Sequence, residues 1–215
     1  MSRHFPNLAV YDLDGTLVDS ICQVHEILNG LRAELGKRPL EVGQLVPWIS
    51  LGGIELMINA LEVRREEAES HLKTFRARYL AEKTPKRLVY DGVFEALEHF
   101  QERHCSLAIC TNKPRNLVEK VLSETGLANY FPCVVAGGDL PTQKPNPANL
   151  LCCLEHFDLQ PSQAIFIGDS RVDQMTAESA DVPFIFFSAG YDDGVFGIEN
   201  GFTISRHSET SSLFQ

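Results

Sequence analysis

The sequence has no excess of positive charge. It contains 19 Lys and Arg residues against 29 Asp and Glu residues, which gives a formal net charge of -10 at pH 7, and its isoelectric point is about 5.1. Proteins that hold nucleic acid through its phosphate backbone need a basic surface, so we expect no nucleic-acid partner. An anionic substrate would have to be held by local cationic groups or by a metal ion.

The sequence also has no long apolar run. No segment approaches the roughly 20 apolar residues that span a bilayer, and residues 1–7 lack the apolar core of a secretory signal. We therefore expect a cytoplasmic protein with no membrane partner. The six cysteines show no zinc-finger spacing and no C-x-x-C pair. Since the adjacent Cys152 and Cys153 could form only a strained bridge, we expect reduced cysteines in the core.

What is present suits one domain, or one domain with a small insertion, because 44% of the 215 residues are hydrophobic. After a first apolar strand, the sequence from residue 88 onward alternates strand and helix patterns, whereas the polar tail at 205–215 has no clear pattern. Strands are expected at residues 8–13, 105–110, 133–136, 164–167 and 183–187, and helices at residues 92–100, 114–124, 147–157 and 172–180. This alternation predicts an α/β fold, a Rossmann-like parallel sheet covered by helices on both faces.

Residues 18–87 follow a different, helical pattern. Apolar residues recur at spacings of three and four from Val18 to Leu35, and Gly36 ends this first helix. Further helices are expected at residues 42–48, 53–61 and 65–80, with no strand signal between them. The stretch is most simply an inserted α-helical cap domain at 18–87, and residues 1–17 plus 88–215 would form the α/β core domain.

Two carboxylates, Asp12 and Asp14, come at the end of the first strand. Ligands bind at this carboxyl edge of an open parallel sheet, and side chains two residues apart on an extended chain point the same way. Gly15 permits a tight turn and exposes backbone N–H groups that can hold an anion. Taken alone, the pattern also fits an ordinary Asp-Gly turn.

Polar residues follow three more strands. Thr111 and Asn112 offer a hydroxyl and an amide, Lys144 lies in a loop bracketed by prolines, and Asp169 and Asp173 open a helix. Each has an ordinary alternative, since Thr, Asn and Asp also cap helices and a surface lysine is usually solvated.

Together, these residues describe a site for phosphoryl chemistry. Asp12, Asp14, Asp169 and Asp173 in one pocket would repel one another without a cation. Carboxylates, water and substrate oxygens are the ligands that Mg²⁺ prefers. The sequence therefore predicts Mg²⁺ as a cofactor.

The order of these motifs resembles the haloacid dehalogenase superfamily of phosphotransferases over nearly the whole chain. The motifs are Asp12-x-Asp14-Gly15-Thr16, Thr111, Lys144-Pro145 and Gly168-Asp169-x-x-x-Asp173. The resemblance implies that Asp12 is the nucleophile, which forms an aspartyl phosphate, and that Asp14 is the general acid and base. Thr111 and Lys144 complete the implied catalytic set.

The same resemblance implies the binding residues. Magnesium would be held by Asp12, the backbone carbonyl of Asp14, Asp169 and, in support, Asp173. The phosphoryl group would be held by Gly15, Thr16, Thr111, Asn112 and Lys144.

Within the superfamily, the chain looks most like the phosphoglycolate phosphatases. The supporting stretches lie at residues 48–53, 90–93, 137–141 and 168–173. Ser50, Asp91 and Asp181 depart from the usual pattern, and the first two lie on or beside the cap that selects the substrate. The expected reaction is magnesium-dependent hydrolysis of a small phosphorylated metabolite, 2-phosphoglycolate to glycolate and phosphate, by a monomer or homodimer.

Other functions remain open at this point. A sugar-phosphate phosphatase, a pyrophosphatase or a phosphomutase would share these motifs. Asp14 argues against a dehalogenase, and the absence of lysine from residues 18–35 argues against a phosphonatase. A non-catalytic phospho-aspartate signalling module also uses Asp, Thr and Lys at strand ends, but such a receiver is shorter and has no helical insertion.

Overall fold

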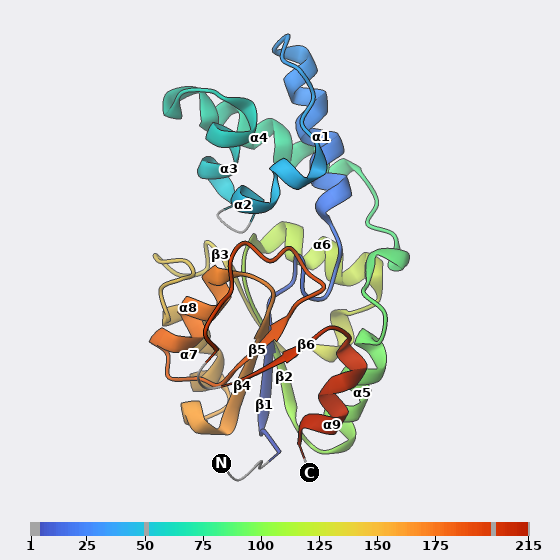
Figure 1. Cartoon of the computed structure of the whole chain (residues 1–215), viewed down its shortest axis with the longest axis vertical. Coiled ribbons are helices and arrows are strands. Elements are labelled where there is room, and N and C mark those ends of the chain that lie inside the picture. The colour runs from blue at the N-terminus through green and yellow to red at the C-terminus, as the bar shows by residue number, and fades with distance from the viewer. Residues whose placement is uncertain (1–4, 50–51, 199–200, 215) are drawn as a thin grey trace.

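The computed structural model describes residues 5–49, 52–198 and 201–214, and its centre is a parallel β-sheet (Figure 1). The strand order is β3-β2-β1-β4-β5-β6, so β1 lies between β2 and β4 and the direction of winding reverses there. Ligands bind at such a switch point, outside the carboxyl ends of the strands. The strands are β1 Leu8–Tyr11, β2 Ser106–Pro114, β3 Cys133–Gly137, β4 Ala164–Gly168, β5 Phe184–Phe187 and β6 Gly201–Ile204.

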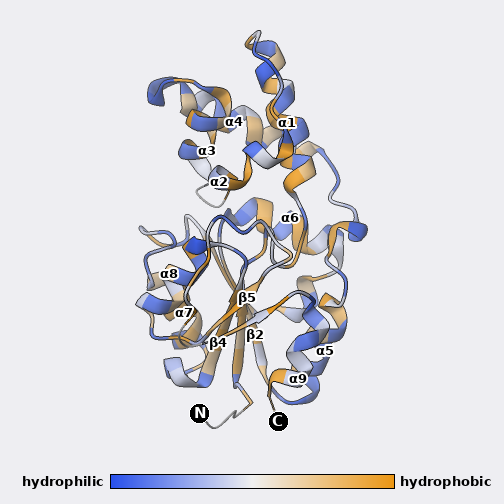
Figure 2. Cartoon of the chain, viewed as in Figure 1, coloured by the Kyte–Doolittle hydropathy of each residue, from blue (hydrophilic) through white to orange (hydrophobic). Residues whose placement is uncertain are grey.

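Helices cover both faces of the sheet, as the sequence predicts. Along β1, Ala9 and Tyr11 join the core cluster that contains α5 Val93–Glu102 and α6 Arg115–Thr125. The alternate residues Leu8 and Val10 join the cluster on the other face, with α7 Ala148–His156 and α8 Arg171–Ser179. Because side chains alternate along a strand, β1 is buried on both faces. Figure 2 shows the hydrophobic residues concentrated along the strands.

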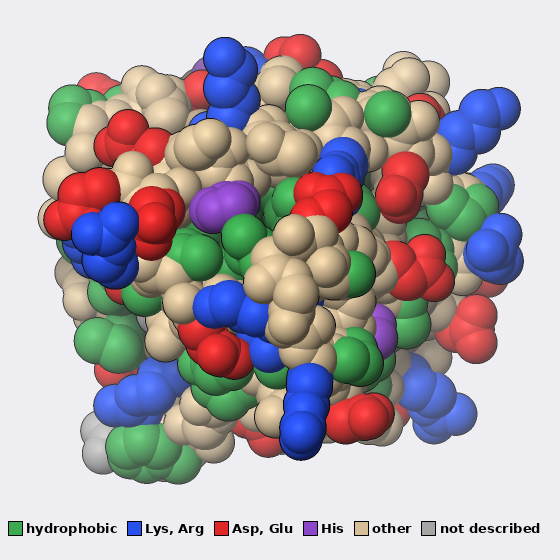
Figure 3. Space-filling view, turned by 90° about the horizontal axis from the view of Figure 1, so that it is seen from above, with side chains coloured by type: hydrophobic (Ala, Val, Ile, Leu, Met, Phe, Trp, Pro, Cys, Tyr) green, Lys and Arg blue, Asp and Glu red, His purple; other side chains and the backbone are tan. Residues whose placement is uncertain are grey.

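Four inserted helices stand above the carboxyl edge of the sheet (Figure 1). They are α1 Ile21–Glu34, α2 Val46–Ile49, α3 Gly53–Leu61 and α4 Arg65–Ala81. The single helix expected at 42–48 is instead a 3₁₀ turn, Val42–Gln44, followed by α2. Pro47 lies in the first turn of α2, where its missing N–H costs no helical hydrogen bond. On the face seen from above, acidic and basic side chains are interspersed (Figure 3).

The two connections to the inserted helices lie side by side. Val18 and Val89 form an antiparallel bridge. The Asp19 N–H donates to the Leu88 carbonyl at 2.7 Å, and the Tyr90 N–H donates to the Leu17 carbonyl at 3.1 Å. The chain therefore leaves the sheet and returns to it at one place. Among the described helices, none combines the length and the apolar character needed to cross a membrane.

Two parts of the fold differ from the sequence prediction. First, β2 continues through Thr111 to Pro114, with a register irregularity between Cys110 and Pro114, so Thr111 lies in the strand rather than beyond it. Second, β6 and α9 Thr210–Leu213 were not predicted. The 3₁₀ turn His207–Glu209 just before α9 packs against α5, and it places His207 in the core at 0% exposure. Short segments of four residues carry too little periodicity to be recognised.

Candidate active site

Three buried carboxylates meet at the switch point of the sheet. Asp12 directly follows β1, Asp169 directly follows β4, and Asp173 lies in the first turn of α8. Since β1 and β4 are neighbouring parallel strands, their carboxyl ends meet. Each of the three residues offers one oxygen, and these oxygens lie within 4.8 Å of one another.

Lys144 is the cation of this cluster. Its Nζ atom lies 2.7 Å from Asp12 Oδ1 and 2.6 Å from Asp173 Oδ1, and its side chain is only 3% exposed. Burial alone would lower the pKa of Lys144, but Asp12 and Asp173 together raise it above its ordinary value. Lys144 therefore stays charged and joins the carboxyl end of β1 to α8.

Asn112 fixes the loop that carries Lys144. Its Nδ2 donates to the Lys144 carbonyl at 3.0 Å, and its Oδ1 accepts from the Lys144 N–H at 2.9 Å. Both polar atoms of the Asn112 amide are therefore hydrogen-bonded to the backbone of Lys144. The side chain of Asn112, which the sequence places among the phosphate-binding groups, acts here on the position of Lys144.

The buried cluster has an excess of negative charge. Burial raises the pKa of Asp12 to about 6, against the opposing effect of Lys144, and Asp173 adds to the rise. Burial, Asp173 and Asp12 also raise the pKa of Asp169 well above its ordinary value. Full ionisation is thus costly without a further cation. Three carboxylates that can each offer an oxygen fit a hard divalent cation such as Mg²⁺.

Gly15 and Thr16 position Asp169. The Thr16 hydroxyl donates to Asp169 Oδ1 at 2.7 Å, and the Tyr191 N–H donates to Asp169 Oδ2 at 2.8 Å. Gly15 has a φ of +85°, and a Cβ atom there would stand 2.2 Å from Asp169 Oδ2. Only glycine fits between the turn and this carboxylate.

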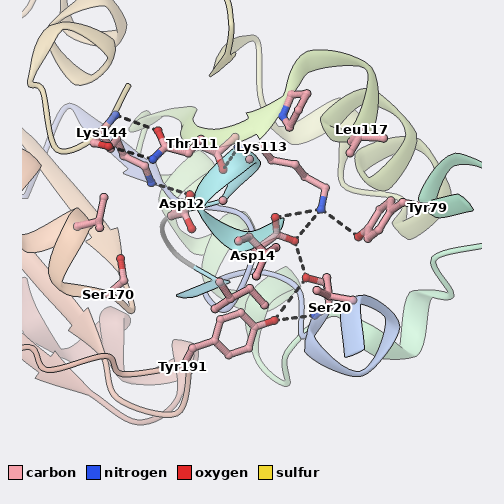
Figure 4. A pocket seen from close by; sticks show the side chains of 18 of the residues that line it. Asp12, Asp14, Ser20, Tyr79, Thr111, Lys113, Leu117, Lys144, Ser170 and Tyr191 are labelled. Carbon is pink, nitrogen blue, oxygen red and sulfur yellow. Dashed lines mark hydrogen bonds and ion pairs between the residues drawn. The ribbon is translucent and has the colours of Figure 1, made fainter. Parts of the chain in front are cut away.

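Asp14 is not one of the three buried carboxylates, and its side chain contacts Ser20 and Lys113 instead (Figure 4). Its Oδ1 accepts from the Ser20 hydroxyl at 2.6 Å, and both of its oxygens lie 3.0 Å from Lys113 Nζ. Lys113 Nζ also donates to the Tyr79 hydroxyl of α4 at 3.0 Å and lies 4.1 Å from the centre of that ring. The two aspartates of the first motif therefore have different environments.

Sequence reasoning missed the groups around Asp14. Lys113 could have been found, because it stands two residues after Thr111 on an extended chain and so shares its side of the strand. Both residues line the same cavity. Tyr79 and Tyr191 belong to no motif, and only the fold brings them to the site. Ser50, one of the departures noted above, lies outside the described residues.

The site opens into a small cavity beneath the inserted helices. Its volume is about 100 Å³, and it is lined at one end by Asp12, Asp14 and Lys144. Apolar side chains from α3 and α4, among them Leu56 and Phe75, form part of its wall. Pockets for drug-sized ligands measure roughly 300–1,000 Å³, so this cavity suits a much smaller molecule.

Comparisons with known proteins identify the family. Residues 9–187 match the family model described as haloacid dehalogenase-like hydrolase. The chain belongs to this family. Phosphoglycolate phosphatase 1 of Pseudomonas aeruginosa is 34% identical over 200 residues, which cover 90% of this chain and 73% of the relative. Phosphoglycolate phosphatase of Cereibacter sphaeroides is 33% identical over 212 residues, which cover 96% of each chain.

Solved structures of other proteins share the fold. A protein described as a predicted phosphoglycolate phosphatase from Haemophilus somnus has a TM-score of 0.87 and 25% identity, with full coverage of both chains. β-Phosphoglucomutase from Clostridium difficile has a TM-score of 0.76 at 16% identity over 95% of this chain and 93% of its own. The predictions of the family, of the α/β fold and of a hydrolase are confirmed.

Proposed function

We propose that the chain is a magnesium-dependent phosphatase that hydrolyses a small phosphomonoester, with 2-phosphoglycolate as its substrate. One observation carries the proposal: the Asp12 carboxylate lies 2.7 Å from the buried ammonium of Lys144 and within 4.8 Å of two further carboxylates. A nucleophile thus stands beside a cation and a set of metal ligands, and phosphoryl transfer depends on such positioning and charge neutralisation. The phosphoglycolate phosphatases among the relatives support the substrate.

The reaction has two steps, in which Asp12 is the nucleophile and Asp14 transfers the protons. Asp12 attacks phosphorus, the bond to the ester oxygen breaks, and the leaving alkoxide takes a proton from Asp14. Water then attacks the aspartyl phosphate, gives its proton to Asp14 and releases inorganic phosphate. The separate surroundings of the two carboxylates support these unequal roles, because Asp12 adjoins the acidic cluster whereas Asp14 faces Ser20 and Lys113.

The remaining predicted residues bind and orient. Asp12, Asp169 and Asp173, with the backbone carbonyl of Asp14, would hold the magnesium ion, which supplies positive charge beside the phosphoryl group. Thr111 and Lys144 hold the phosphoryl oxygens, together with the turn at Gly15 and Thr16. Asn112 keeps Lys144 in place.

Residues 18–87 act as a cap domain over the core formed by residues 1–17 and 88–215. The paired connections at Leu17 to Asp19 and Leu88 to Tyr90 support this division, because only two adjacent chain segments need to bend when the cap moves. Closure would exclude bulk water from the aspartyl phosphate.

A phosphate-release assay with magnesium tests the proposal. The panel comprises 2-phosphoglycolate, sugar phosphates, nucleotides and pyrophosphate, with Asp12→Asn as the inactive control. We expect 2-phosphoglycolate to have the highest kcat/KM. A tenfold preference for a sugar phosphate, about 1.4 kcal/mol, would overturn the proposal that 2-phosphoglycolate is the substrate. Isomerised phosphosugar without phosphate release would identify a mutase, and a stable aspartyl phosphate without turnover would identify a signalling module.

A further inference from the structure

Arg76 of α4 is a cation in the wall of the active-site cavity that pairs with none of the described residues. It lines the same cavity as Asp12 and Lys144. Among residues 5–49, 52–198 and 201–214, no group forms a hydrogen bond or ion pair with Arg76. Burial lowers the pKa of Arg76. The other cavity cations are occupied, since Lys144 pairs with Asp12 and Lys113 pairs with Asp14.

Apolar side chains form much of the cavity wall that includes Arg76. Leu72 and Phe75 of the same helix and Leu56 of α3 line the cavity with it. A charged group that loses hydration in such a wall is destabilised unless a ligand or partner compensates. By contrast, Arg78, two residues further along α4, pairs with Glu34 at 2.5 Å on the outside of the inserted helices. The unpaired guanidinium therefore lines the cavity in which the proposed substrate would supply an anion.

We propose that Arg76 binds a carboxylate on the leaving group of the phosphoester and so selects short phosphorylated hydroxy acids. The inference rests on the proposed phosphatase function and adds the residue that reads the substrate. A guanidinium can hold both oxygens of a carboxylate. The phosphoryl end is served by Lys144, and a cavity of about 100 Å³ suits a carboxylate on a short chain.

Steady-state kinetics with three substrates of similar length tests the inference. The substrates are 2-phosphoglycolate, 2-hydroxyethyl phosphate, which replaces the carboxylate by a neutral hydroxymethyl group, and ethanediol bisphosphate. They are compared in the wild type, Arg76→Met, Arg76→Lys and the matched control Arg78→Met. Thermal unfolding of each variant shows whether it is folded.

We expect Arg76→Met to lower kcat/KM for 2-phosphoglycolate by about 10- to 100-fold, the effect of losing hydrogen bonds between charged groups. Turnover of 2-hydroxyethyl phosphate should change by less than about threefold. Arg76→Lys should recover part of the loss, since it keeps the charge and loses the paired geometry. Arg78→Met should leave both substrates nearly unchanged.

Three outcomes would overturn the inference while leaving the phosphatase intact. The first is an equal loss on both monoesters in Arg76→Met. The second is wild-type turnover of 2-hydroxyethyl phosphate as fast as that of 2-phosphoglycolate. The third is a tenfold preference for the bisphosphate, which would show that the site recognises a second phosphate. Absence of turnover of any phosphoester by the wild type would instead overturn the proposed function itself.

Discussion

Lys113 holds both carboxylate oxygens of Asp14 at 3.0 Å and at the same time donates to Tyr79. One side chain of β2 thus connects the proposed acid and base to helix α4 of the inserted segment. Burial would lower the pKa of Lys113, but Asp14 and Tyr79 raise it. The ammonium therefore stays charged between the two parts of the molecule.

Replacing Lys113 by Met should lower kcat by about 10- to 100-fold, because the Asp14 carboxylate loses its cation. Tyr79→Phe should cost less than about fivefold alone and almost nothing in the Lys113→Met background, since both changes break one network. The measurement is a double-mutant cycle in kcat. Lys120→Met is the matched control, because Lys120 also faces the Tyr79 ring, at 5.5 Å, but pairs with Glu124. A loss in Lys120→Met equal to that in Lys113→Met would contradict the role of the Asp14 contact.

Asp12→Asn and Asp14→Asn should fail in different ways. Without the Asp12 carboxylate, no phosphoenzyme can form, so acid-quenched enzyme should carry no label from a ³²P-substrate. Asp14→Asn should slow turnover by about 10²- to 10⁴-fold, the usual contribution of a general acid and base. Its affinity for Mn²⁺, followed by electron paramagnetic resonance, should stay close to that of the wild type. Labelled Asp12→Asn protein would rule out Asp12 as the nucleophile.

Magnesium should stabilise the protein more strongly as the pH rises. Burial raises the pKa of Asp12 from 3.8 to about 6, so the metal-free folded state favours the protonated carboxyl. The stability that Asp12 contributes is fully present below its unfolded pKa of 3.8 and is lost as the pH rises through about 6. A bound cation offsets this loss. The Tm difference between Mg²⁺ and EDTA should grow from pH 4 to pH 7 and shrink in Asp169→Asn, whereas a difference independent of pH would contradict the expectation.

His207 should make the protein sensitive to acid. Its Nε2 lies 2.7 Å from the Thr16 carbonyl, and its ring packs 4.4 Å from that of Phe187. Burial lowers its pKa from 6.5 to about 4, so its contribution is present above pH 6.5 and is lost as the pH falls through about 4. The shift corresponds to about 3 kcal/mol in the free energy of unfolding.

Urea denaturation at pH 7 and pH 4.5 measures that contribution. His207→Gln can still donate to the Thr16 carbonyl but does not titrate, so we expect it to lose less stability between the two pH values than the wild type. His156→Gln, a change at an exposed histidine, should behave like the wild type. Equal pH dependence in the wild type and His207→Gln would show that His207 is not the acid-sensitive group.

The sequence predicts those parts of the site that follow from strand ends. Asp12 and Asp169 come together because β1 and β4 are parallel neighbours, and apolar runs followed by polar residues reveal where such strands end. The proline-bracketed loop also draws attention to Lys144, which the structure places beside Asp12 and Asp173. These features depend on local pattern and on the geometry common to parallel sheets.

The remaining parts depend on packing between distant segments. The contact of Lys113 with Tyr79 requires the position of α4 above the sheet, which the period of a helix does not give. Asn112 has the right chemistry for phosphate, yet its amide pairs with the Lys144 backbone. The β6 strand and His207 were not predicted because their segments are short, although they support the sheet and the first motif.

The link from His207 to the Thr16 carbonyl also has a meaning for synthesis. The two residues are 191 positions apart in the chain, and a ribosome needs roughly 10 to 40 s to cover that distance at about 5–20 residues per second. During this interval the turn that contains Thr16 lacks its contact with the imidazole of His207. The nascent chain thus carries the proposed catalytic aspartates long before the contact that secures their loop, which can form only after residue 207 has been synthesised.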